Sequence, residues 1–342
     1  MGATGKDIMK KTIFAAAALA ALLAGATTAD AADALKLKLK WVPQAQFAGY
    51  YVAAQKGYYK DAGLDVTIDA ASTDVSPVQA LVGGTADVVI DWAADALSSR
   101  EKGVQLVNIA QPFKNSGLLL TCRKDMGVAS TADFKGKTLG VWFGGNEYPF
   151  YAFMSKLGLP TQGGADGVEV LKQGFNVDPL LQKQAACVST MTYNEYGQVL
   201  DGGLKPSDLV VFNYRDEGVG MLEDGLYVMQ DKLADAKFKD VLTRFIKASM
   251  KGWEDAVKNP DEAAQIVVDS DPTGAATLDH QKYMMGEVAK LIDPTFKGAL
   301  DPADFKQTVA TLLANKSGDN PALTKEPDAG AYTTEITDAA AK

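Results

Sequence analysis

Aromatic rings and polar side chains recur along this chain just after its predicted strands, in both halves of the sequence. In doubly wound α/β sheets, ligands bind outside the carboxyl ends of the strands, so we expect these side chains to face one cleft. Rings would stack on a flat ligand, while amides and carboxylates would bond its polar rim. The candidate ligand-binding residues are Trp41, Gln44, Gln46, Tyr50, Asp91, Trp92, Gln111, Trp142, Gly144, Gly145, Asn146, Glu147, Tyr193, Asn194, Glu195, Tyr196 and Glu217.

Each candidate also has a purely structural interpretation. Trp41 and Trp92 fit packing between a helix and a sheet, as large aromatic residues often do. The glycines at 144–145 fit a tight turn into a helix that Glu147 helps to start. The tyrosines at 50–51 fit a core and surface pair. Recurrence at equivalent strand ends, which core packing does not require, favours a binding site.

Charge narrows the class of ligand. Asp91, Glu147, Glu195 and Glu217 would direct carboxylates toward the cleft, and Arg215 is the one cation that we expect at a strand end. A sulfonate, nitrate or bicarbonate would bind poorly there, because these anions would be repelled by the carboxylates. An amino-heterocycle suits these carboxylates, because they accept hydrogen bonds from exocyclic amines and can hold a ring nitrogen protonated.

Composition argues against several other classes of function. The formal net charge of −9 and the single histidine leave no basic footprint for nucleic acid and no histidine-based catalytic set. The sequence has no P-loop, nucleophile elbow or His/Cys metal cluster. We therefore predict no catalytic residues, no metal and no cofactor.

The N-terminal segment is typical of a signal peptide. Three lysines precede an apolar run over 13–26, and small residues at 29 and 31 fit a cleavage site. We predict a cleaved signal peptide at 1–31, a mature chain beginning near Ala32 and export to the periplasm. The run is shorter than the ~20 residues of a spanning helix. An uncleaved membrane anchor is the alternative, and a lipoprotein would need a cysteine at the cleavage point.

The remaining chain, about 310 residues, exceeds the usual size of one hydrophobic core, so two lobes are expected. Strands alternate with helical segments, which indicates βαβ units and parallel sheets. From 238 to about 315 the chain is predicted to be helical, and 317–342 to be a loosely attached tail. The predicted strands are 35–41, 64–68, 86–90, 106–110 and 117–123, then 138–141, 168–171, 186–191 and 209–213.

The two cysteines, Cys122 and Cys187, lie in apolar, strand-like surroundings. An oxidising periplasm would allow one disulfide between them. Two buried thiols are equally compatible with the sequence, so the pairing stays open at this stage.

Several motifs resemble one family of binding proteins. Trp41-Val-Pro-Gln, Ala53-Ala-Gln-Lys-Gly-Tyr-Tyr with Gly63-Leu-Asp-Val, Gly83-Gly-Thr-Ala-Asp-Val and Ala132-Asp-Phe-Lys-Gly-Lys-Thr-Leu-Gly-Val together resemble the SsuA/THI5-like periplasmic binding proteins. The resemblance covers nearly all of the mature chain. Its opening is most similar to the branch that binds pyrimidine precursors of thiamine and to the related riboflavin-binding proteins.

The resemblance implies an α/β fold, the type II periplasmic binding protein, with two lobes, a hinge of two crossovers and a cleft between the lobes. The crossovers are expected near 120–123 and 220–227. Lobe 1 would then comprise 32–121 plus 224–316, and lobe 2 would comprise 122–223. It also implies a monomer that delivers a small molecule to an inner-membrane ABC permease with its ATPase.

Combined with the charges, the resemblance implies a hydroxymethyl- or formylamino-pyrimidine as ligand. Trp41 and Tyr193 or Tyr196 would sandwich the ring, while Asp91, Glu147 and Glu195 would accept from its amines. A flavin such as riboflavin is the main alternative, and it would depend instead on the amides of Gln44, Gln46, Gln111 and Asn146. An aliphatic sulfonate or nitrate would find donors only at the helix start at Asn146.

A pyrimidine-forming enzyme is the alternative from another class. The enzymatic relatives in this superfamily use a cysteine-rich iron-binding motif and a histidine that supplies pyrimidine atoms. This chain lacks that motif, and its one histidine, His280, lies in the late helical region, where a surface or helix-end role is expected.

Overall fold

A computed structural model describes residues 31–70, 76–315 and 321–342 of the chain. The predicted signal peptide therefore lies, apart from its last residue, outside the described residues. Asp33–Lys342 forms one compact unit, to which the following description refers. Over the described ranges, none of the helices combines the length and apolar character needed to cross a membrane.

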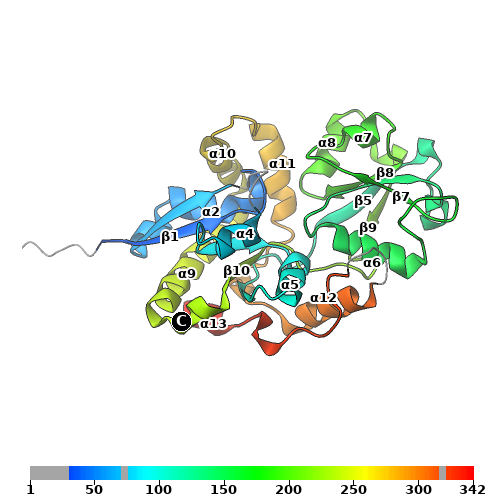
Figure 1. Cartoon of the computed structure of the whole chain (residues 1–342). Helices are drawn as coiled ribbons and strands as arrows, with labels where there is room; N and C mark the ends of the chain where they lie inside the picture. Colours follow the sequence, from blue (N-terminus) through cyan, green and yellow to red (C-terminus); the bar gives the residue numbers. More distant parts are fainter. Residues whose placement is uncertain (1–30, 71–75, 316–320) are drawn as a thin grey trace, which may run out of the picture. The chain divides into compact units, whose positions relative to one another are not determined.

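The first lobe is built on a five-stranded sheet (Figure 1). β1 is parallel to β2 and β3, while β10 is antiparallel to β3 and β4. The sheet is thus mixed, not wholly parallel as predicted, because β10 enters it from the second lobe. In sheet order the strands are β2 (Leu64–Asp69), β1 (Asp33–Lys38), β3 (Val88–Asp91), β10 (Gly225–Met229) and β4 (Leu106–Ala110).

A second five-stranded sheet forms the core of the other lobe. β6 is parallel to β7 and β8, and β5 is antiparallel to both β8 and β9. In sheet order the strands are β7 (Glu169–Lys172), β6 (Thr138–Val141), β8 (Cys187–Met191), β5 (Leu118–Arg123) and β9 (Leu209–Asn213).

Two crossovers join the lobes, as expected, but the first lies earlier than predicted. All of β5 pairs with β8 and β9, so the chain has already entered the second lobe at Leu118. The boundary predicted between 121 and 122 would divide this strand. The crossovers are the segments 111–117 and 214–224, between the last strand of one sheet and the first of the other.

Helices cover both sheets, and their ends follow local signals. α4 begins with a capping box between Ser76 and Gln79, and Asp235 caps α9. The single helix predicted over 45–62 is broken at Gly57, whose φ of 77° a helix does not permit. The helices are α2 (Ala48–Gln55), α3 (Tyr58–Asp61), α4 (Pro77–Val82), α5 (Ala93–Glu101), α6 (Glu147–Leu157), α7 (Asp178–Leu181), α8 (Glu195–Asp201), α9 (Ala236–Lys258), α10 (Pro260–Ser270), α11 (Leu278–Val288), α12 (Pro302–Ala314) and α13 (Glu335–Ala340).

Single turns of 3₁₀ helix complete the secondary structure. They are η1 (Ala45–Phe47), η2 (Lys124–Met126), η3 (Thr131–Phe134), η4 (Pro206–Asp208), η5 (Gln230–Ala234), η6 (Pro294–Phe296) and η7 (Ala329–Ala331).

The tightest helix contact lies in the first lobe, between α2 and α9. A Cβ placed on Gly252 would come within 2.1 Å of the Gly49 carbonyl oxygen, and one on Gly49 would meet the Trp253 ring. Glycine at both positions lets the two backbones approach. Trp253 is consequently fully buried, against Tyr50 and Phe113.

The C-terminal region differs from its predicted arrangement in two ways. α12, assigned to the first lobe, packs against α6 of the second lobe as well as against α5. The predicted loose tail is instead well packed where the structure describes it: α13 lies on α9, Ile336 is buried, and Thr333 N donates to Asn108 O at 2.9 Å (Figure 1). The buried apolar residues Ala331, Ile336 and Ala340 supply that packing.

Cys122 and Cys187 form a disulfide. The two residues are directly opposite each other on the neighbouring strands β5 and β8. The sequence left open a disulfide or two buried thiols, and the register of β5 and β8 places the two cysteines so that the disulfide forms.

Candidate ligand-binding site

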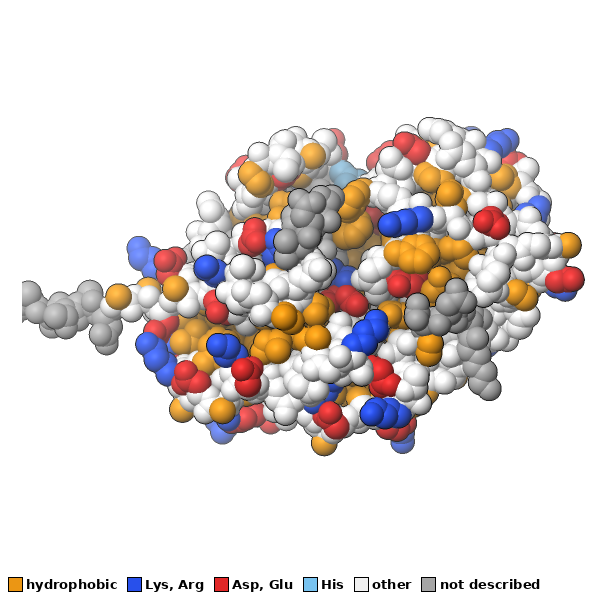
Figure 2. All heavy atoms as spheres, in the orientation of Figure 1, with side chains coloured by type: hydrophobic (Ala, Val, Ile, Leu, Met, Phe, Trp, Pro, Cys, Tyr) orange, Lys and Arg blue, Asp and Glu red, His pale blue; other side chains and the backbone are white. Residues whose placement is uncertain are grey.

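The carboxyl ends of strands from both sheets border one cleft of about 700 Å³, a volume typical of small-molecule sites. In the space-filling view the surface is hollowed between the lobes, with hydrophobic side chains around the hollow (Figure 2). The cleft is lined by Lys40, Trp41, Ser76, Pro77, Val78, Gln79, Asp95, Ser99, Trp142, Phe143, Gly144, Asn146, Lys172, Gln173, Gly174 and Phe175.

Aromatic rings from both lobes meet in this cleft. Trp41 follows β1 of the first lobe, and its ring centroid lies 6.3 Å from that of Trp142 and 4.6 Å from that of Phe175. Trp142 follows β6 of the second lobe, and its Nε1 donates to Gly174 O at 2.9 Å, which fixes the ring. Phe175 follows β7 and leaves 56% of its surface exposed. These rings form an apolar wall for a flat ligand.

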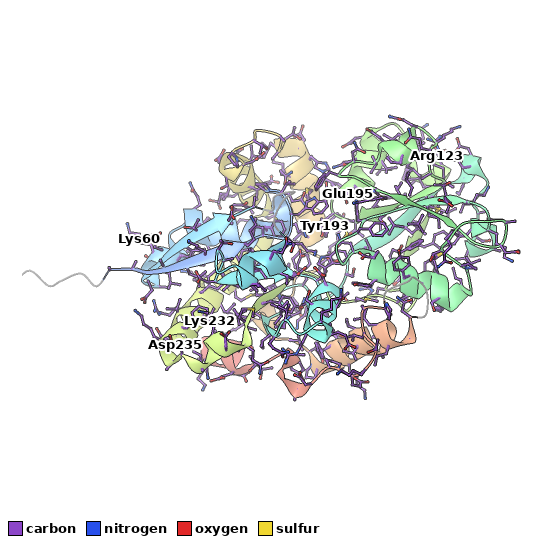
Figure 3. The ribbon with its side chains drawn as sticks, viewed as in Figure 1. Lys60, Arg123, Tyr193, Glu195, Lys232 and Asp235 are labelled. Atoms are coloured by element: carbon purple, nitrogen blue, oxygen red, sulfur yellow. A yellow bond between two sulfur atoms is a disulfide. The ribbon has the colours of Figure 1, made fainter. Side chains whose placement is uncertain are left out.

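A second, deeper pocket of about 30 Å³ adjoins the cleft and shares four of its residues. This volume suits a water or a small substituent and not a whole ring. Figure 3 shows Tyr193 and Glu195 on the side of the second lobe that faces the first. The pocket is lined by Lys40, Trp41, Gln44, Gln46, Trp92, Trp142, Asn146, Met191, Tyr193 and Glu195.

Two polar atoms of the deep pocket are buried without a hydrogen-bond partner among the described residues: the Tyr193 hydroxyl and Asn146 Oδ1. Burial without a partner costs about 1–3 kcal/mol per group. Burial raises the pKa of Tyr193, so its hydroxyl stays protonated and available as a donor. The two atoms are therefore suited to a ligand group that both donates and accepts.

Lys40 is a cation of the cleft that the sequence analysis missed. Its Nζ lies 2.5 Å from Asp91 Oδ1 and 3.9 Å from Asp95 Oδ2, and its side chain is 8% exposed. Lys40 immediately precedes Trp41, so the strand-end rule that selected Trp41 also indicated Lys40. The statement that Arg215 is the one strand-end cation was wrong: Lys40 occupies the cleft, and Arg215 does not line it.

Two buried carboxyls, Glu195 in the lining of the deep pocket and Asp224 bonded to two residues of that lining, hold protons more tightly than usual. Burial raises the pKa of Glu195 to about 7, although Met191 N and Asn194 Nδ2 donate to its two oxygens. Burial also raises the pKa of Asp224 to about 6. Asp224 accepts from Gln46 Nε2 at 2.6 Å and from Trp92 Nε1 at 3.1 Å, which orients both side chains toward the pocket.

Glu147 orders a loop and does not line the cleft. Its Oε2 accepts from Gly145 N at 2.8 Å, at the start of α6, and burial raises its pKa. Gly145 has a φ of 99°, and a Cβ there would lie 2.4 Å from Asp95 Cβ across the lobes. The glycine is thus needed both for the backbone conformation and for the contact with α5.

Four predicted site residues lie elsewhere. Tyr50 is buried in the core, 5.6 Å from the Trp253 ring. Gln111 binds the second crossover by donating to Glu223 O. Tyr196 packs in the apolar cluster around Val177 and Val199, because one step along α8 turns it away from the direction of Glu195. Glu217 lies in the turn after the edge strand β9 and lines neither pocket.

Apart from these four and from Gly145 and Glu147, the structure brings the predicted residues together. Trp41, Gln44, Gln46, Trp92, Trp142, Gly144, Asn146, Tyr193 and Glu195 line the cleft or its deep pocket, and Asp91 and Asn194 bond to residues that do. Lys172, Gln173 and Phe175 were missed, although they follow a strand that was predicted at 168–171. Neither Met191 nor Asp224 follows a predicted strand, so the strand-end rule did not select them.

The charges that face the cleft differ from those expected. Of the four carboxylates expected in the cleft, Asp91 is paired with Lys40, Glu147 is bonded to its own loop, and Glu217 is absent from the lining. Charged residues that do line the two pockets are Lys40, Lys172, Asp95 and Glu195. Both signs are thus present among the described lining residues, and burial raises the pKa of Asp95 to about 8, so an excess of carboxylate charge no longer selects the ligand.

Two curated proteins are similar to this chain in sequence. The formylaminopyrimidine-binding protein of Halalkalibacterium halodurans is 26% identical over 242 residues, covering 70% of this chain and 71% of that protein. The riboflavin-binding protein RibY of Chloroflexus aurantiacus is 26% identical over 238 residues, covering 67% of this chain and 64% of that protein.

The fold has solved counterparts. A Candida albicans protein described as having the generic periplasmic binding protein structural fold superimposes with a TM-score of 0.64 at 18% identity, covering 88% of this chain and 96% of that one. The family model described as NMT1/THI5 like matches residues 44–263. With two α/β lobes, two crossovers and an intervening cleft, this chain belongs to the NMT1/THI5-like family and has the periplasmic binding protein fold.

Proposed function

We propose that this protein is the solute-binding component of an ABC importer, which captures a planar heterocycle and does not transform it. The observation that carries the proposal is the convergence of Trp41, Trp142 and Phe175, from the two lobes, on one cleft. A ring bound against Trp41 would contact both lobes at once, so that binding would stabilise their closed arrangement.

The deep pocket supports a ligand with a small polar substituent. The ring would occupy the larger cleft, where the volume is sufficient, and the substituent would enter the deep pocket. There the Tyr193 hydroxyl and Asn146 Oδ1 have no hydrogen-bond partner in the part of the chain that the structure describes, and Glu195 is the adjoining carboxyl. A hydroxymethyl group can donate to Asn146 Oδ1 and accept from the Tyr193 hydroxyl, and an amino group on the ring can donate to Asn146 Oδ1.

A thiamine pyrimidine precursor, hydroxymethylpyrimidine or formylaminopyrimidine, meets this description best. It carries such substituents on a flat ring. The relative in H. halodurans is named for binding formylaminopyrimidine.

Riboflavin is the second candidate, favoured by the size and the lining of the cleft. A volume of about 700 Å³ leaves room for a ring system larger than a pyrimidine. Flavin carbonyls need donors, and Gln79 and Lys172 line that volume. The C. aurantiacus relative is named for binding riboflavin.

The partners of such a protein would be an inner-membrane permease and its ATPase, with delivery from the periplasm. This part of the proposal follows from the family. The signal peptide predicted at 1–31 agrees with it, and the protein is expected to act as a monomer.

Native mass spectrometry of purified protein tests the ligand class. We expect a bound compound with the mass of an aminopyrimidine or a flavin, and a flavin would also absorb visible light. Adding the correct compound at about 100 times its dissociation constant should raise the free energy of unfolding by about 2.7 kcal/mol.

Two results would contradict the proposal. Stabilisation by alkanesulfonates and not by either ring class would overturn the ligand assignment. Recovery of the added compound with an altered mass would indicate an enzyme, the alternative from another class.

A further inference from the structure

The one histidine of the chain is near the start of a helix, as predicted, and lies between the lobes. His280 is on α11, which packs against α10 and η1 of the first lobe. Its Nε2 lies 2.8 Å from Asn194 Oδ1, which belongs to the segment between β8 and α8 of the second lobe. The imidazole side chain is only 18% exposed.

Asn194 connects this histidine to the deep pocket. Its Nδ2 donates to Gln44 Oε1 of the first lobe at 3.2 Å and to Glu195 Oε1 at 2.8 Å. Gln44 in turn donates to Gln46 Oε1 at 2.5 Å. Asn194 Oδ1 also accepts from Gln198 Nε2 of α8 at 3.0 Å, so His280 supplies the contact to this amide from the first lobe's α11, and the amide's other end contacts two residues lining the pocket.

α11 and α8 approach each other closely around the bond between His280 and Asn194. Tyr283, one turn along α11 from His280, donates its hydroxyl to Thr192 O of the second lobe at 2.7 Å. A Cβ on Gly197 of α8 would lie 2.5 Å from the Tyr283 ring, so glycine there permits the approach of α8 to α11.

We propose that His280 is a positioning residue that latches α11 to Asn194, holding the two lobes closed and the amides of the deep pocket in place. The inference rests on the lobe closure that the proposed function requires. Since Asn194 Oδ1 is an acceptor, His280 must donate from Nε2, and the neutral tautomer with that proton is sufficient.

The latch should weaken in acid. Burial lowers the pKa of His280 in the closed arrangement, an effect that Asp201 of α8 opposes from 3.9 Å. Asp201 is 78% exposed, so its attraction is screened. Tyr283 stacks beside the imidazole on the same helix, and Lys282 of α11 pairs with Asp261 of α10. A histidine whose pKa is depressed on closure favours the closed state at high pH, and this contribution is lost as the pH falls.

Distances between two spin labels, measured by double electron–electron resonance on the ligand-free protein, test the latch without any assumption about the ligand. Spin labels at K205C and Q265C, two exposed positions in different lobes, report the closed and open populations, with the native disulfide intact. We expect His280→Ala to lower the closed-to-open ratio about fivefold at pH 8, the value of one ordinary hydrogen bond. His280→Gln, which keeps an amide donor, should restore most of the closed population and reduce its dependence on pH between 5 and 8 to the part that Glu195 and Asp224 contribute, which remains in every variant.

Gly197→Ala serves as the second variant, because it separates α8 from α11 and leaves His280 unchanged. If Gly197→Ala opens the protein and His280→Ala does not, the latch is overturned. A wild-type protein that shows only the open distance at every pH would also overturn it. A closed population that follows His280 as expected, in a protein that binds neither ring class, would contradict the ligand assignment and leave the latch intact.

Discussion

Lys40 Nζ lies 2.5 Å from Asp91 Oδ1 at the base of the cleft, and the two side chains are 8% and 0% exposed. Asp91 also accepts from Trp92 N at 2.8 Å. Burying each charge costs free energy, and the attraction between Lys40 and Asp91 offsets this cost only while both side chains are present.

Removing one partner of this ion pair should therefore be costly. We expect Lys40→Met to lower the free energy of unfolding by about 3–5 kcal/mol, because it leaves the Asp91 carboxylate buried and unpaired. Urea denaturation followed by circular dichroism measures the change. Lys60→Met, at an exposed lysine of the same lobe (Figure 3), is the control and should change stability by less than about 0.5 kcal/mol. Equal stabilities of the two variants would show that Lys40 and Asp91 are not coupled.

Ligand binding should depend on the residues that line the cleft and not on the predicted residues that lie elsewhere. We expect Trp41→Ala to weaken ligand binding at least tenfold, or about 1.4 kcal/mol, since the ring loses its stacking surface. Glu217→Gln and Tyr196→Phe should leave the dissociation constant within about twofold of wild type. Isothermal titration with the compound identified by mass spectrometry measures all three. A larger effect at Glu217 than at Trp41 would place the ligand outside the cleft.

Glu195 should make stability depend on pH. Its folded pKa, raised by burial to about 7, exceeds the ordinary value of 4.5. The protonated form is therefore favoured by folding, and its contribution, complete below pH 4.5, is lost as the pH rises through 7.

Between these pH values the wild type should lose roughly 3 kcal/mol that Glu195→Gln does not lose. Asp224 titrates in the same direction, so the quantity to measure is the difference between wild type and variant in urea denaturation at several pH values. Identical pH profiles would show that folding does not raise the pKa of Glu195.

The disulfide should stabilise the second lobe. Cys122 and Cys187 are 65 residues apart, and closing a loop of that length in the unfolded chain corresponds to about 4 kcal/mol in the entropic treatment. We expect the double variant Cys122→Ala, Cys187→Ala to lose about this amount in urea denaturation. Dithiothreitol should destabilise the wild type and leave the double variant unchanged. A wild type that dithiothreitol does not affect would mean that the bond is absent.

Much of the site was predictable because strand ends are a local property of the sequence. Trp41 and Trp142 each stand at the end of a predicted strand, and the rule that ligands bind at the carboxyl ends selects them without knowledge of the fold. The two-lobed division likewise followed from chain length and from the alternation of strands and helices. The position of β5 was not predictable in this way, because whether a strand pairs in the sheet it leaves or in the one it enters depends on distant partners.

By itself, the sequence determined which residue types stand at the strand ends, because local patterning sets where each strand stops. Tertiary structure alone decided which of them meet. It paired Asp91 with Lys40, turned Tyr196 into an apolar cluster, and brought His280 against Asn194 from 86 residues away. The physical reason is that pairing, desolvation and helix phase are fixed by neighbours distant in the chain, and these determine whether a polar side chain is available to a ligand or already bonded within the protein.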